Sequence, residues 1–545
     1  MSRGKYVIGA DFGTLSVRAA VVSVSDGSTA AQASFTYPHG VMEKDGFALA
    51  DPGDYREGLF KVIKQAAEES GVPAEDIVAI GLDATSSTFV PVDEGGIPLC
   101  EKPGLSGSPH AWMKMWKHHH AQPEADDLTR LAQERGEAFL SRCGGKINAE
   151  WMLPKLLEIY RADREVYDAA AYFAEAGDQM VWELTGERTA SAGPLGYKML
   201  CSDSDPSIGP EYLDAAEEGF GSVLLKLPAK RVPLGKTAGL LKKDAAERLG
   251  LCPGIPVAAA NIDAHVTFAA CGEAKENNML LIIGTSCCTI LLSREFRPVE
   301  GAFGILKDGV FPGFYGYESG QSAVGDTLAW FAENACGAGL KEEASARGLS
   351  VHQLLTEKAE ELKAGQSGLL ALDWWGGNRS ILADSSLSGA LFGLTLSTRP
   401  EEIYRALIEG MGFGLREIIE AYRRAGVPVE GLYASGGIAA KNRMFLQIYS
   451  DITGLEIRRV RSSESSALGS AVFAAAAAGE ERGGCVDIFA ASAAMGGLYE
   501  DVITPDPENK AVYDRLFAVW HDLHEKMGRD EASALKELHR IRSCS

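Results

Sequence analysis

Two short segments combine glycine with polar residues in a way that suits phosphate. Asp11-Phe-Gly-Thr14 follows a short apolar run, which predicts a carboxylate and a glycine turn at the end of a strand. Main-chain N–H groups in such a turn can approach phosphate oxygens because glycine has no Cβ in the way. Asp11 could hold Mg²⁺ there, directly or through water, since that ion prefers oxygen ligands. Gly284-Thr285-Ser286 repeats the pattern later in the chain, and a purely structural turn is the alternative at both places.

A third glycine motif, Ser435-Gly436-Gly437, ends another apolar run just before a helix that contains Lys441. A glycine pair at a strand-to-helix junction lets a flat base lie against the backbone. This motif alone identifies no nucleotide. Gly235-Lys-Thr237 contains the last residues of a P-loop, but Lys230 stands where the leading glycine is required, so the P-loop is excluded.

Asp263 is the candidate catalytic residue. It lies in Asn261-Ile-Asp-Ala-His265, directly after the apolar segment 256–260, which predicts a strand that delivers the carboxylate to the start of a helix. A carboxylate in this position could accept the proton of a substrate hydroxyl as that hydroxyl attacks ATP. The local sequence fits a helix N-cap equally well.

Three consecutive histidines, His118-His119-His120, suggest a metal motif. We expect these residues on a helix, where successive side chains point about 100° apart and cannot chelate one ion together. A solvated or partly packed helix face is therefore predicted here.

The two phosphate turns lie in similar predicted hairpins. Residues 6–11 and 17–24 form strands around the first turn, and residues 279–284 and 288–292 do so around the second. Two such copies, about half a chain apart, predict a duplicated architecture. Strands alternate with helices elsewhere, which predicts an α/β fold with mixed sheets covered on both faces. Further strands are expected at 77–83, 255–260, 432–435 and 455–460, and helices at 54–70, 151–161, 169–185, 323–334, 400–425 and 442–453.

The length of the chain predicts at least two domains. Its 545 residues exceed the roughly 250–300 at which one hydrophobic core stops growing. The polar stretch 272–278 precedes the second hairpin, so we place the division there, with domains 1–276 and 277–545. A cleft between the domains would be lined by both Gly-Thr turns, since ligand sites in α/β proteins lie at strand ends.

Composition narrows the class of protein. Hydrophobic residues make up 46% and charged residues 23%, values typical of globular proteins. The net charge of −22 repels phosphodiester backbones and anionic lipid, so neither nucleic acid nor a membrane is expected as the main partner. No signal peptide and no apolar stretch of about 18 residues is present, which predicts a cytoplasmic protein. The ten cysteines form no C-x-x-C pair and are expected to be reduced thiols.

Several motifs follow one another in an order that is typical of a known family. They comprise residues 8–14, 235–240, 254–257, 261–265, 284–286, 435–437 with Asn442, and 467–471. Together they resemble the carbohydrate kinase family that includes glycerol kinase, xylulokinase and ribulokinase. The resemblance implies two actin-like (ribonuclease H-like) domains, each a mixed β-sheet flanked by helices, with the active site in the cleft between them. It places the sugar site and the catalytic Asp in residues 1–276 and ATP binding in residues 277–545.

The roles that the resemblance implies fall on residues already singled out. Asp263 matches the catalytic base, and Asp11 matches the carboxylate associated with Mg²⁺, an ion that Asp263 also helps to position. The implied cofactors are ATP and Mg²⁺, and the assembly that the resemblance allows is a homodimer. The phosphate loops fall on Thr14, Gly284, Thr285 and Ser286, and the adenosine pocket falls on Gly436, Gly437 and Lys441.

Residues 83–88, 109–117, 196–198, 316–322 and 372–379 are similar to the ribulokinase branch in particular. This similarity puts Ser86, Lys198 and Glu318 at a ketopentose. It implies that the γ-phosphoryl of ATP goes to the 5-hydroxyl of L-ribulose, giving L-ribulose 5-phosphate for L-arabinose catabolism. The buried cation and carboxylate would discriminate because a wrong sugar leaves them unpaired. Two alternatives stay open: a kinase for D-ribulose or another pentulose or pentitol, and a non-catalytic actin-like protein that binds nucleotide or sugar.

Overall fold

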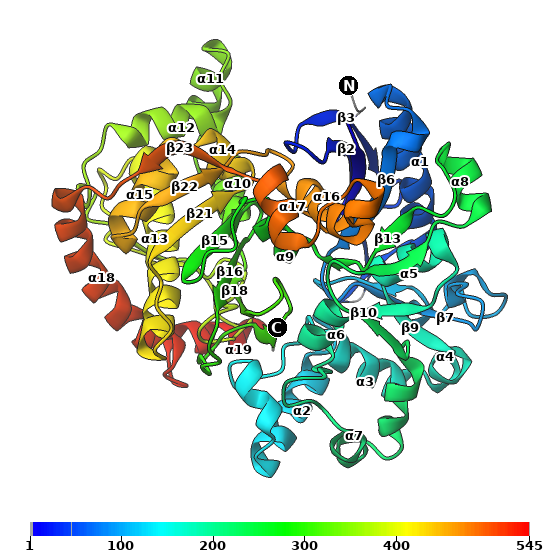
Figure 1. Ribbon diagram of the computed structural model, residues 1–545. Helices are drawn as coiled ribbons and strands as arrows, with labels where there is room; N and C mark the ends of the chain where they lie inside the picture. The colour runs from blue at the N-terminus through cyan, green and yellow to red at the C-terminus, as the bar shows by residue number, and fades with distance from the viewer. Residues whose placement is uncertain (1–3, 45, 544–545) are drawn as a thin grey trace.

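The computed structural model describes residues 4–44 and 46–543. Its N-terminal half is built on a seven-stranded mixed sheet with the order β12-β13-β6-β1-β2-β3, in which β14 also pairs with β6 (Figure 1). Nearly continuous apolar runs bury both faces of the central strands, as expected for an α/β fold. The strands are β1 (Tyr6–Phe12), β2 (Ser16–Ser23), β3 (Thr29–Thr36), β6 (Ile77–Ala84), β12 (Thr237–Leu240), β13 (Pro256–Ala258) and β14 (Asn261–Ile262).

A second seven-stranded sheet forms the core of the C-terminal half, with the order β17-β18-β16-β15-β21-β22-β23. Here β15 pairs antiparallel with β16 and parallel with β21, just as β1 pairs with β2 and β6. An equivalent hairpin therefore opens each half, and the predicted duplication is confirmed. The strands are β15 (Asn278–Ile283), β16 (Cys287–Ser293), β17 (Gly304–Lys307), β18 (Tyr315–Gln321), β21 (Gly431–Ser435), β22 (Ile457–Val460) and β23 (Leu498–Ile503).

Helices α9 (Asp263–Ala269) and α16 (Ser465–Ala478) lie between the two sheets, in a hydrophobic cluster that draws on strands of both. Helix α16 belongs to the C-terminal half of the sequence but packs on β1 and β6 of the first sheet (Figure 1). A Cβ on Gly9 would lie 1.9 Å from the carbonyl oxygen of Ala467, and one on Gly81 would lie 2.0 Å from that of Ser470. Glycine at these two strand positions is what lets the helix backbone approach so closely.

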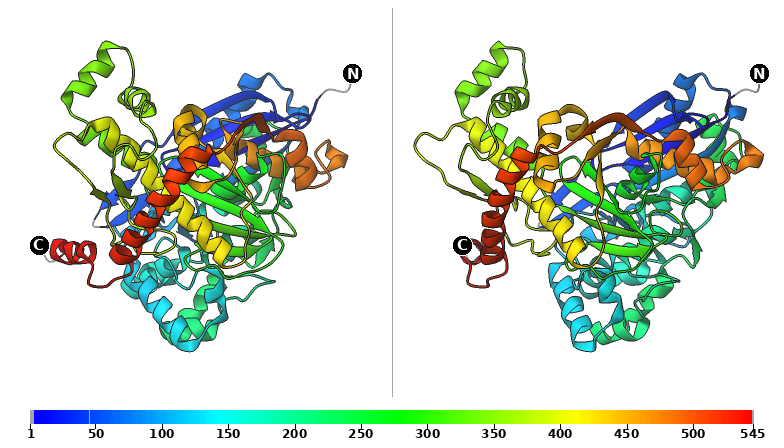
Figure 2. Two further views of the ribbon diagram at one scale, coloured as in Figure 1. Left: turned by 90° about the vertical axis from the view of Figure 1, so that its left-hand side faces the viewer. Right: turned by 60° about the vertical axis from the view of Figure 1, so that its left-hand side comes forward.

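The outer faces of the sheets are covered by longer helices. Helix α1 (Pro52–Ser70) lies on the first sheet; it begins after Asp51, whose side chain accepts the N–H of Gly53, and ends at the left-handed Gly71. The second sheet is covered by α13 (Pro400–Arg424) and α15 (Arg443–Thr453), and α18 (Pro507–Gly528) packs outside these two helices. Both views of Figure 2 show α18 running along the outside of this half, toward the C-terminal helix.

A smaller lobe inserted in the N-terminal half lies below both sheets in Figure 1 and is coloured cyan to green. It packs around its own hydrophobic cluster. Next to it lies a five-stranded sheet with the order β4-β5-β8-β7-β9. The strands of that sheet are β4 (Met42–Lys44), β5 (Phe47–Ala50), β7 (Phe89–Val92), β8 (Met113–Lys114) and β9 (Tyr172–Glu175), and the helices of the lobe include α2 (Gln122–Arg135), α3 (Met152–Ala162), α4 (Arg164–Ala169) and α7 (Pro210–Ala216).

The helix predicted at 169–185 is wrong in its first part. Helix α4 ends at Ala169, strand β9 occupies Tyr172–Glu175, and only α5 (Ala176–Thr185) is helical. The reason is tertiary: β9 completes the five-stranded sheet by pairing with β7, and its Tyr-Phe pair suits a strand. Apart from the helix expected at His118–His120, which is a loop, the other predicted strands and helices are present, with ends shifted by at most two residues.

Two further expectations concern the chain as a whole. Over the ranges that the structure describes, none of the helices combines the length and the apolar character needed to cross a membrane. All nine cysteines in those ranges are free thiols, which confirms the prediction of reduced cysteines for them.

Candidate active site between the two halves

A cavity of about 250 Å³ lies between the halves of the chain. Both halves line it, as the cleft predicted from the two Gly-Thr turns requires. Several residues predicted for the site meet here: Thr14, Ser86 and Asp263 from the first half, and Gly284, Thr285, Ser286 and Glu318 from the second. Residues not predicted for the site also line the cavity: Thr85, Ser87, Trp116, Glu150, Trp151, Ile262, Ala264, Ile282, Cys288, Phe303, Arg379 and Ser466.

Asp263 reaches the cavity because β14 pairs with β6 and then turns directly into α9. The residue before the helix is Ile262, and no side chain caps the helix, so the N-cap alternative for Asp263 is not what the structure adopts. The Asp263 carboxylate accepts the N–H of Ala264 at 2.7 Å. Burial, with the nearby charge of Asp11, raises the pKa of Asp263 to about 7. A carboxylate with this pKa is suited to accept a proton near neutral pH.

Asp11 and Asp83 are register partners on the adjacent parallel strands β1 and β6, and both are buried. Ser470 donates its hydroxyl to Asp83 Oδ2 at 2.5 Å, while Asp83 Oδ1 has no hydrogen-bond partner. Burial raises the pKa of both carboxyls, and for Asp83 the charge of Asp11 adds to the effect. Two neighbouring buried carboxylates call for a proton or a cation, and these oxygen donors fit Mg²⁺. Sequence reasoning singled out Asp11 but not Asp83, although Asp83 is the polar residue at the end of a fully buried strand.

Lys198 and Glu318 form a buried ion pair beside the cavity. Lys198 Nζ lies 2.8 Å from Glu318 Oε2, and His265 Nε2 lies 3.3 Å from the same oxygen. Burial alone would raise the pKa of Glu318, but the Lys198 ammonium and His265 outweigh it and hold this pKa at about 2. Glu318 lines the cavity, whereas Lys198 lies behind it and does not. Lys198 therefore acts on the cavity through Glu318.

The glycine motifs of the second half lie at neighbouring strand ends. Strands β15 and β21 run in parallel with Ile282 opposite Ser435, so Gly284 and Gly436 emerge side by side. A Cβ on Gly436 (φ +98°) would lie 2.4 Å from the carbonyl oxygen of Ile283, whereas Gly284 and Gly437 face open space. Such exposed backbone can accept phosphate or a flat base. Lys441, at the end of helix α14 (Gly437–Lys441), is exposed and does not line the cavity.

Lys155 organises one wall of the cavity from behind. Its ammonium, fully buried on α3, donates to the carbonyl oxygens of Ser87 at 3.0 Å and of Met115 at 2.7 Å. Ser87 directly follows Ser86 in the chain, and Met115 directly precedes Trp116. Ser86 and Trp116 both line the cavity. The indole N–H of Trp116 in turn donates to Thr14 Oγ1 at 3.1 Å. One helix thus ties the wall that carries Ser86 and Trp116 to the glycine turn at Thr14.

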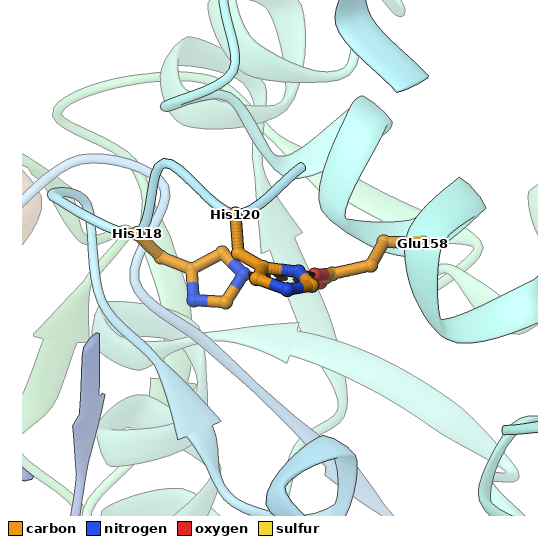
Figure 3. A group of neighbouring side chains, drawn as sticks. All are labelled: His118, His120 and Glu158. Carbon is orange, nitrogen blue, oxygen red and sulfur yellow. Dashed lines mark hydrogen bonds and ion pairs between the residues drawn. The ribbon is translucent and has the colours of Figure 1, made fainter. Parts of the chain in front are cut away.

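The three consecutive histidines lie in a loop after β8, so the helix predicted for them is wrong. Figure 3 shows that two of them, His118 and His120, converge on Glu158 of α3. The buried His118 accepts the N–H of Ala48 at Nδ1, at 3.3 Å, which leaves Nε2 to donate to Glu158 at 3.0 Å. Lys114 Nζ also lies 2.9 Å from Glu158, so this carboxylate is already paired. The cluster anchors the loop that carries Trp116 to α3.

Comparisons with known proteins identify the family of the chain. Residues 6–271 match the N-terminal domain, and residues 279–478 the C-terminal domain, of the FGGY family of carbohydrate kinases. The chain is 43% identical to a ribulokinase of Anoxybacillus flavithermus, over 98% of this chain and 96% of that protein. A ribulokinase of Geobacillus thermodenitrificans is also 43% identical, with the same coverage. The crystal structure of a xylulose kinase from Rhodospirillum rubrum superposes with a TM-score of 0.76 at 24% identity, covering 96% of this chain and 99% of that one.

The duplicated actin-like fold, with buried carboxylates and glycine turns around a cavity between its halves, is the arrangement expected of a phosphotransferase that uses ATP. The chain belongs to the FGGY family of carbohydrate kinases. It is thus an ATP-dependent sugar kinase, as its resemblance to that family implied.

Proposed function

We propose that the protein is a ribulokinase, which transfers the γ-phosphoryl group of ATP to the 5-hydroxyl of L-ribulose. The observation that carries this proposal is the position of Asp263 in one cavity with Glu318 and with both phosphate turns. The proposal is supported by the ribulokinases to which the chain is 43% identical over nearly its whole length. The two domains are proposed to comprise residues 1–276 and 277–545. A cytoplasmic location and a homodimer stay predictions.

In the proposed mechanism, the substrate hydroxyl lies against Asp263, which accepts its proton as the oxygen attacks the γ-phosphorus. Amide groups of the turns at Thr14 and at Gly284-Thr285-Ser286 stabilise charge on the transferring phosphoryl group. Gly436, Gly437 and Lys441 are the proposed adenosine contacts. Closure of the two halves around the cavity would exclude water, which otherwise competes as the acceptor.

Asp11 and Asp83 would hold Mg²⁺. Asp263 interacts electrostatically with both carboxyls, so the ion would also influence Asp263. When bound, this ion neutralises negative charge on the phosphates of ATP. On the sugar side, Ser86 and Glu318 would bond to hydroxyls directly, and Lys198 would keep Glu318 ionised and oriented.

A panel of acceptors tests the proposal. ADP release is measured with L-ribulose, D-ribulose, L-xylulose, D-xylulose, ribitol and glycerol at saturating ATP and Mg²⁺. The expected result is the highest kcat/KM for L-ribulose. D-ribulose or ribitol as the best substrate would support the alternative kinase for another pentulose or pentitol, and glycerol or D-xylulose would contradict the ribulokinase assignment. A lack of transfer to all six, in a folded protein that binds ATP, would favour a non-catalytic binding protein.

A further inference from the structure

Glu150 and Arg379 form an ion pair at the junction of three cavities. The two side chains line the candidate active-site cavity and two neighbouring cavities of about 500 Å³ and 320 Å³. Glu150 comes from the N-terminal half, just before α3, and Arg379 comes from the C-terminal half, between β19 (Leu370–Leu372) and β20 (Ala390–Phe392). Arg379 Nη2 lies 3.3 Å from Glu150 Oε1. The pair thus joins the two halves at the wall of the sugar cavity.

Arg379 sits on well-anchored backbone. Ser380, next to Arg379, accepts the N–H of Gly320 at 3.1 Å through its buried hydroxyl. On the other side, the Asn378 side chain accepts the N–H groups of Ile381 and Leu382 at 3.1 and 3.0 Å. The Arg379 side chain is therefore presented from a fixed turn, as a binding residue should be.

Arg379 has more hydrogen-bonding capacity than the protein uses. Its side chain is only 8% exposed, and its Nε–H has no partner. Nη1 has the Cys288 sulfur at 3.9 Å, a weak acceptor. A buried donor without an acceptor is unfavourable, so such a group at a cavity wall points to a ligand oxygen.

The charges of the pair favour a neutral ligand over phosphate. Burial would raise the pKa of Glu150, but Arg379 and His119 outweigh it and hold this pKa at about 2, so Glu150 is ionised. An anion that approached Arg379 would also meet this carboxylate, whereas a polyol can accept from the guanidinium and donate to the carboxylate. The rings of Trp116 and Phe303, with centroids 5.7 and 5.4 Å from the guanidinium, add the apolar wall typical of small-ligand sites.

Building on the ribulokinase function above, we propose that Arg379 and Glu150 are sugar-binding residues. Arg379 donates to oxygens of the sugar, and Glu150 accepts from one of its hydroxyl groups. Because the two residues belong to different halves of the chain, a bound sugar contacts both halves through them. Sugar binding thereby favours the closed arrangement in which ATP and Asp263 meet.

The proposal is tested with Arg379→Met, Arg379→Lys and Glu150→Gln in the full-length protein. Calorimetry measures the Kd of L-ribulose, or of the panel sugar that the wild type phosphorylates best, and separately the Kd of a non-hydrolysable ATP analogue. We expect the sugar Kd to rise at least tenfold in Arg379→Met and several-fold in Glu150→Gln. Arg379→Lys keeps the charge but not the planar fork, so it should fall between Arg379→Met and the wild type. The ATP-analogue Kd should change less than twofold.

Lys146→Met is the matched control. Lys146 also joins the two halves next to the same turn, through a hydrogen bond of 3.1 Å to the carbonyl oxygen of Leu382, but it does not line the sugar cavity. Its sugar Kd should stay within twofold of the wild type. A sugar Kd within twofold of the wild type in Arg379→Met, or an ATP-analogue Kd that rises as much as the sugar Kd, would overturn the proposal.

Two further results keep the test decisive. If Arg379→Met does not fold, as judged by its melting curve, Arg379→Lys and Glu150→Gln carry the test, and an unchanged sugar Kd in both would overturn the proposal. The wild-type panel separates this inference from the proposed function. A wild type that prefers L-ribulose, combined with normal sugar binding in the variants, would reject only the role of Arg379 and Glu150, whereas a wild type that phosphorylates no sugar would reject both.

Discussion

The ammonium of Lys198 lies 2.8 Å from Glu318 Oε2, and of the two residues only Glu318 lines the sugar cavity. The sequence motifs implied that both residues touch the sugar. In the structure Glu318 lines the cavity and Lys198 pairs with it from behind, so we propose that Glu318 contacts the sugar and that Lys198 keeps Glu318 charged. Removing one partner of a buried pair leaves an uncompensated charge, which costs more than replacing both.

Glu318→Gln and Lys198→Met should therefore each affect both stability and sugar binding, because each leaves a buried charge without its partner. Both should raise the sugar KM by an amount that corresponds to about 1–3 kcal/mol of lost binding free energy, whereas the affinity for ATP should change little. Lys198→Met should also lower the melting temperature, because Glu318 is then buried without its cation. The double variant should recover part of that stability but none of the sugar affinity. Melting curves and calorimetry check this, and a rise in ATP Kd equal to that for sugar would contradict the assignment.

Asp178 should make stability depend on pH. It is buried on α5, where desolvation raises its pKa to about 7, and it accepts the N–H of Ser191 at 3.0 Å. Between its unfolded pKa of 3.8 and about 7, the folded state holds a proton that the unfolded chain has released, so stability falls as pH rises through this window. The total effect is at most roughly 4 kcal/mol.

Asp178→Asn keeps the acceptor for Ser191 and removes the charge. We expect its melting temperature to match the wild type at about pH 3.5, below the unfolded pKa, and to exceed it by a growing margin from pH 5 to pH 8. The control is Asp168→Asn, the same chemical change at an exposed carboxylate, which should leave the pH dependence as in the wild type. Parallel pH curves for the wild type and Asp178→Asn would show that this carboxyl does not titrate as described.

Asp11 is expected to set the requirement for Mg²⁺. Asp11→Asn halves the charge of the Asp11–Asp83 pair, so the Mg²⁺ concentration that gives half-maximal rate should rise several-fold, and high Mg²⁺ should restore part of the activity. Titration with Mn²⁺ followed by electron paramagnetic resonance gives a readout that does not depend on turnover. An unchanged Mn²⁺ affinity in the variant would place the metal elsewhere.

Local sequence motifs predicted the site residues that lie at the end of a single strand. Asp11 lies near the end of an apolar strand, and Asp263 and Gly284 directly follow one, so the sequence alone indicates that all three lie at strand ends. The α/β class, the duplicated hairpin and the cleft followed from the same periodicity. Strand β9 was missed because its pairing with β7 is made by residues about eighty positions apart, which local propensity does not report.

The rest of the site depends on contacts between distant segments. Asp83 matters because β6 pairs in register with β1, and Arg379 matters because it meets Glu150, 229 residues away in the sequence. Neither relationship leaves a local pattern. The helix prediction for the three histidines was wrong because it considered only the local sequence. The segment is a loop, in which His118 and the nearby Lys114 pair with the distant Glu158.

Asp263→Asn tests the mechanism most directly, because it separates a kinase from a binding protein. The substitution keeps the size of the side chain and an oxygen to accept the N–H of Ala264, so the fold and ATP binding should survive. The amide cannot take the hydroxyl proton, and loss of a general base commonly lowers the rate by about 10² to 10⁴. We expect kcat to fall toward the upper end of that range, since the same carboxylate lies within the field of Asp11, where we propose that Mg²⁺ binds. Unlike Asp11→Asn, this variant should not recover at high Mg²⁺. Calorimetric binding of sugar and nucleotide, measured beside steady-state turnover, checks the outcome, and near-normal turnover in a well-folded Asp263→Asn protein would rule out Asp263 as the base.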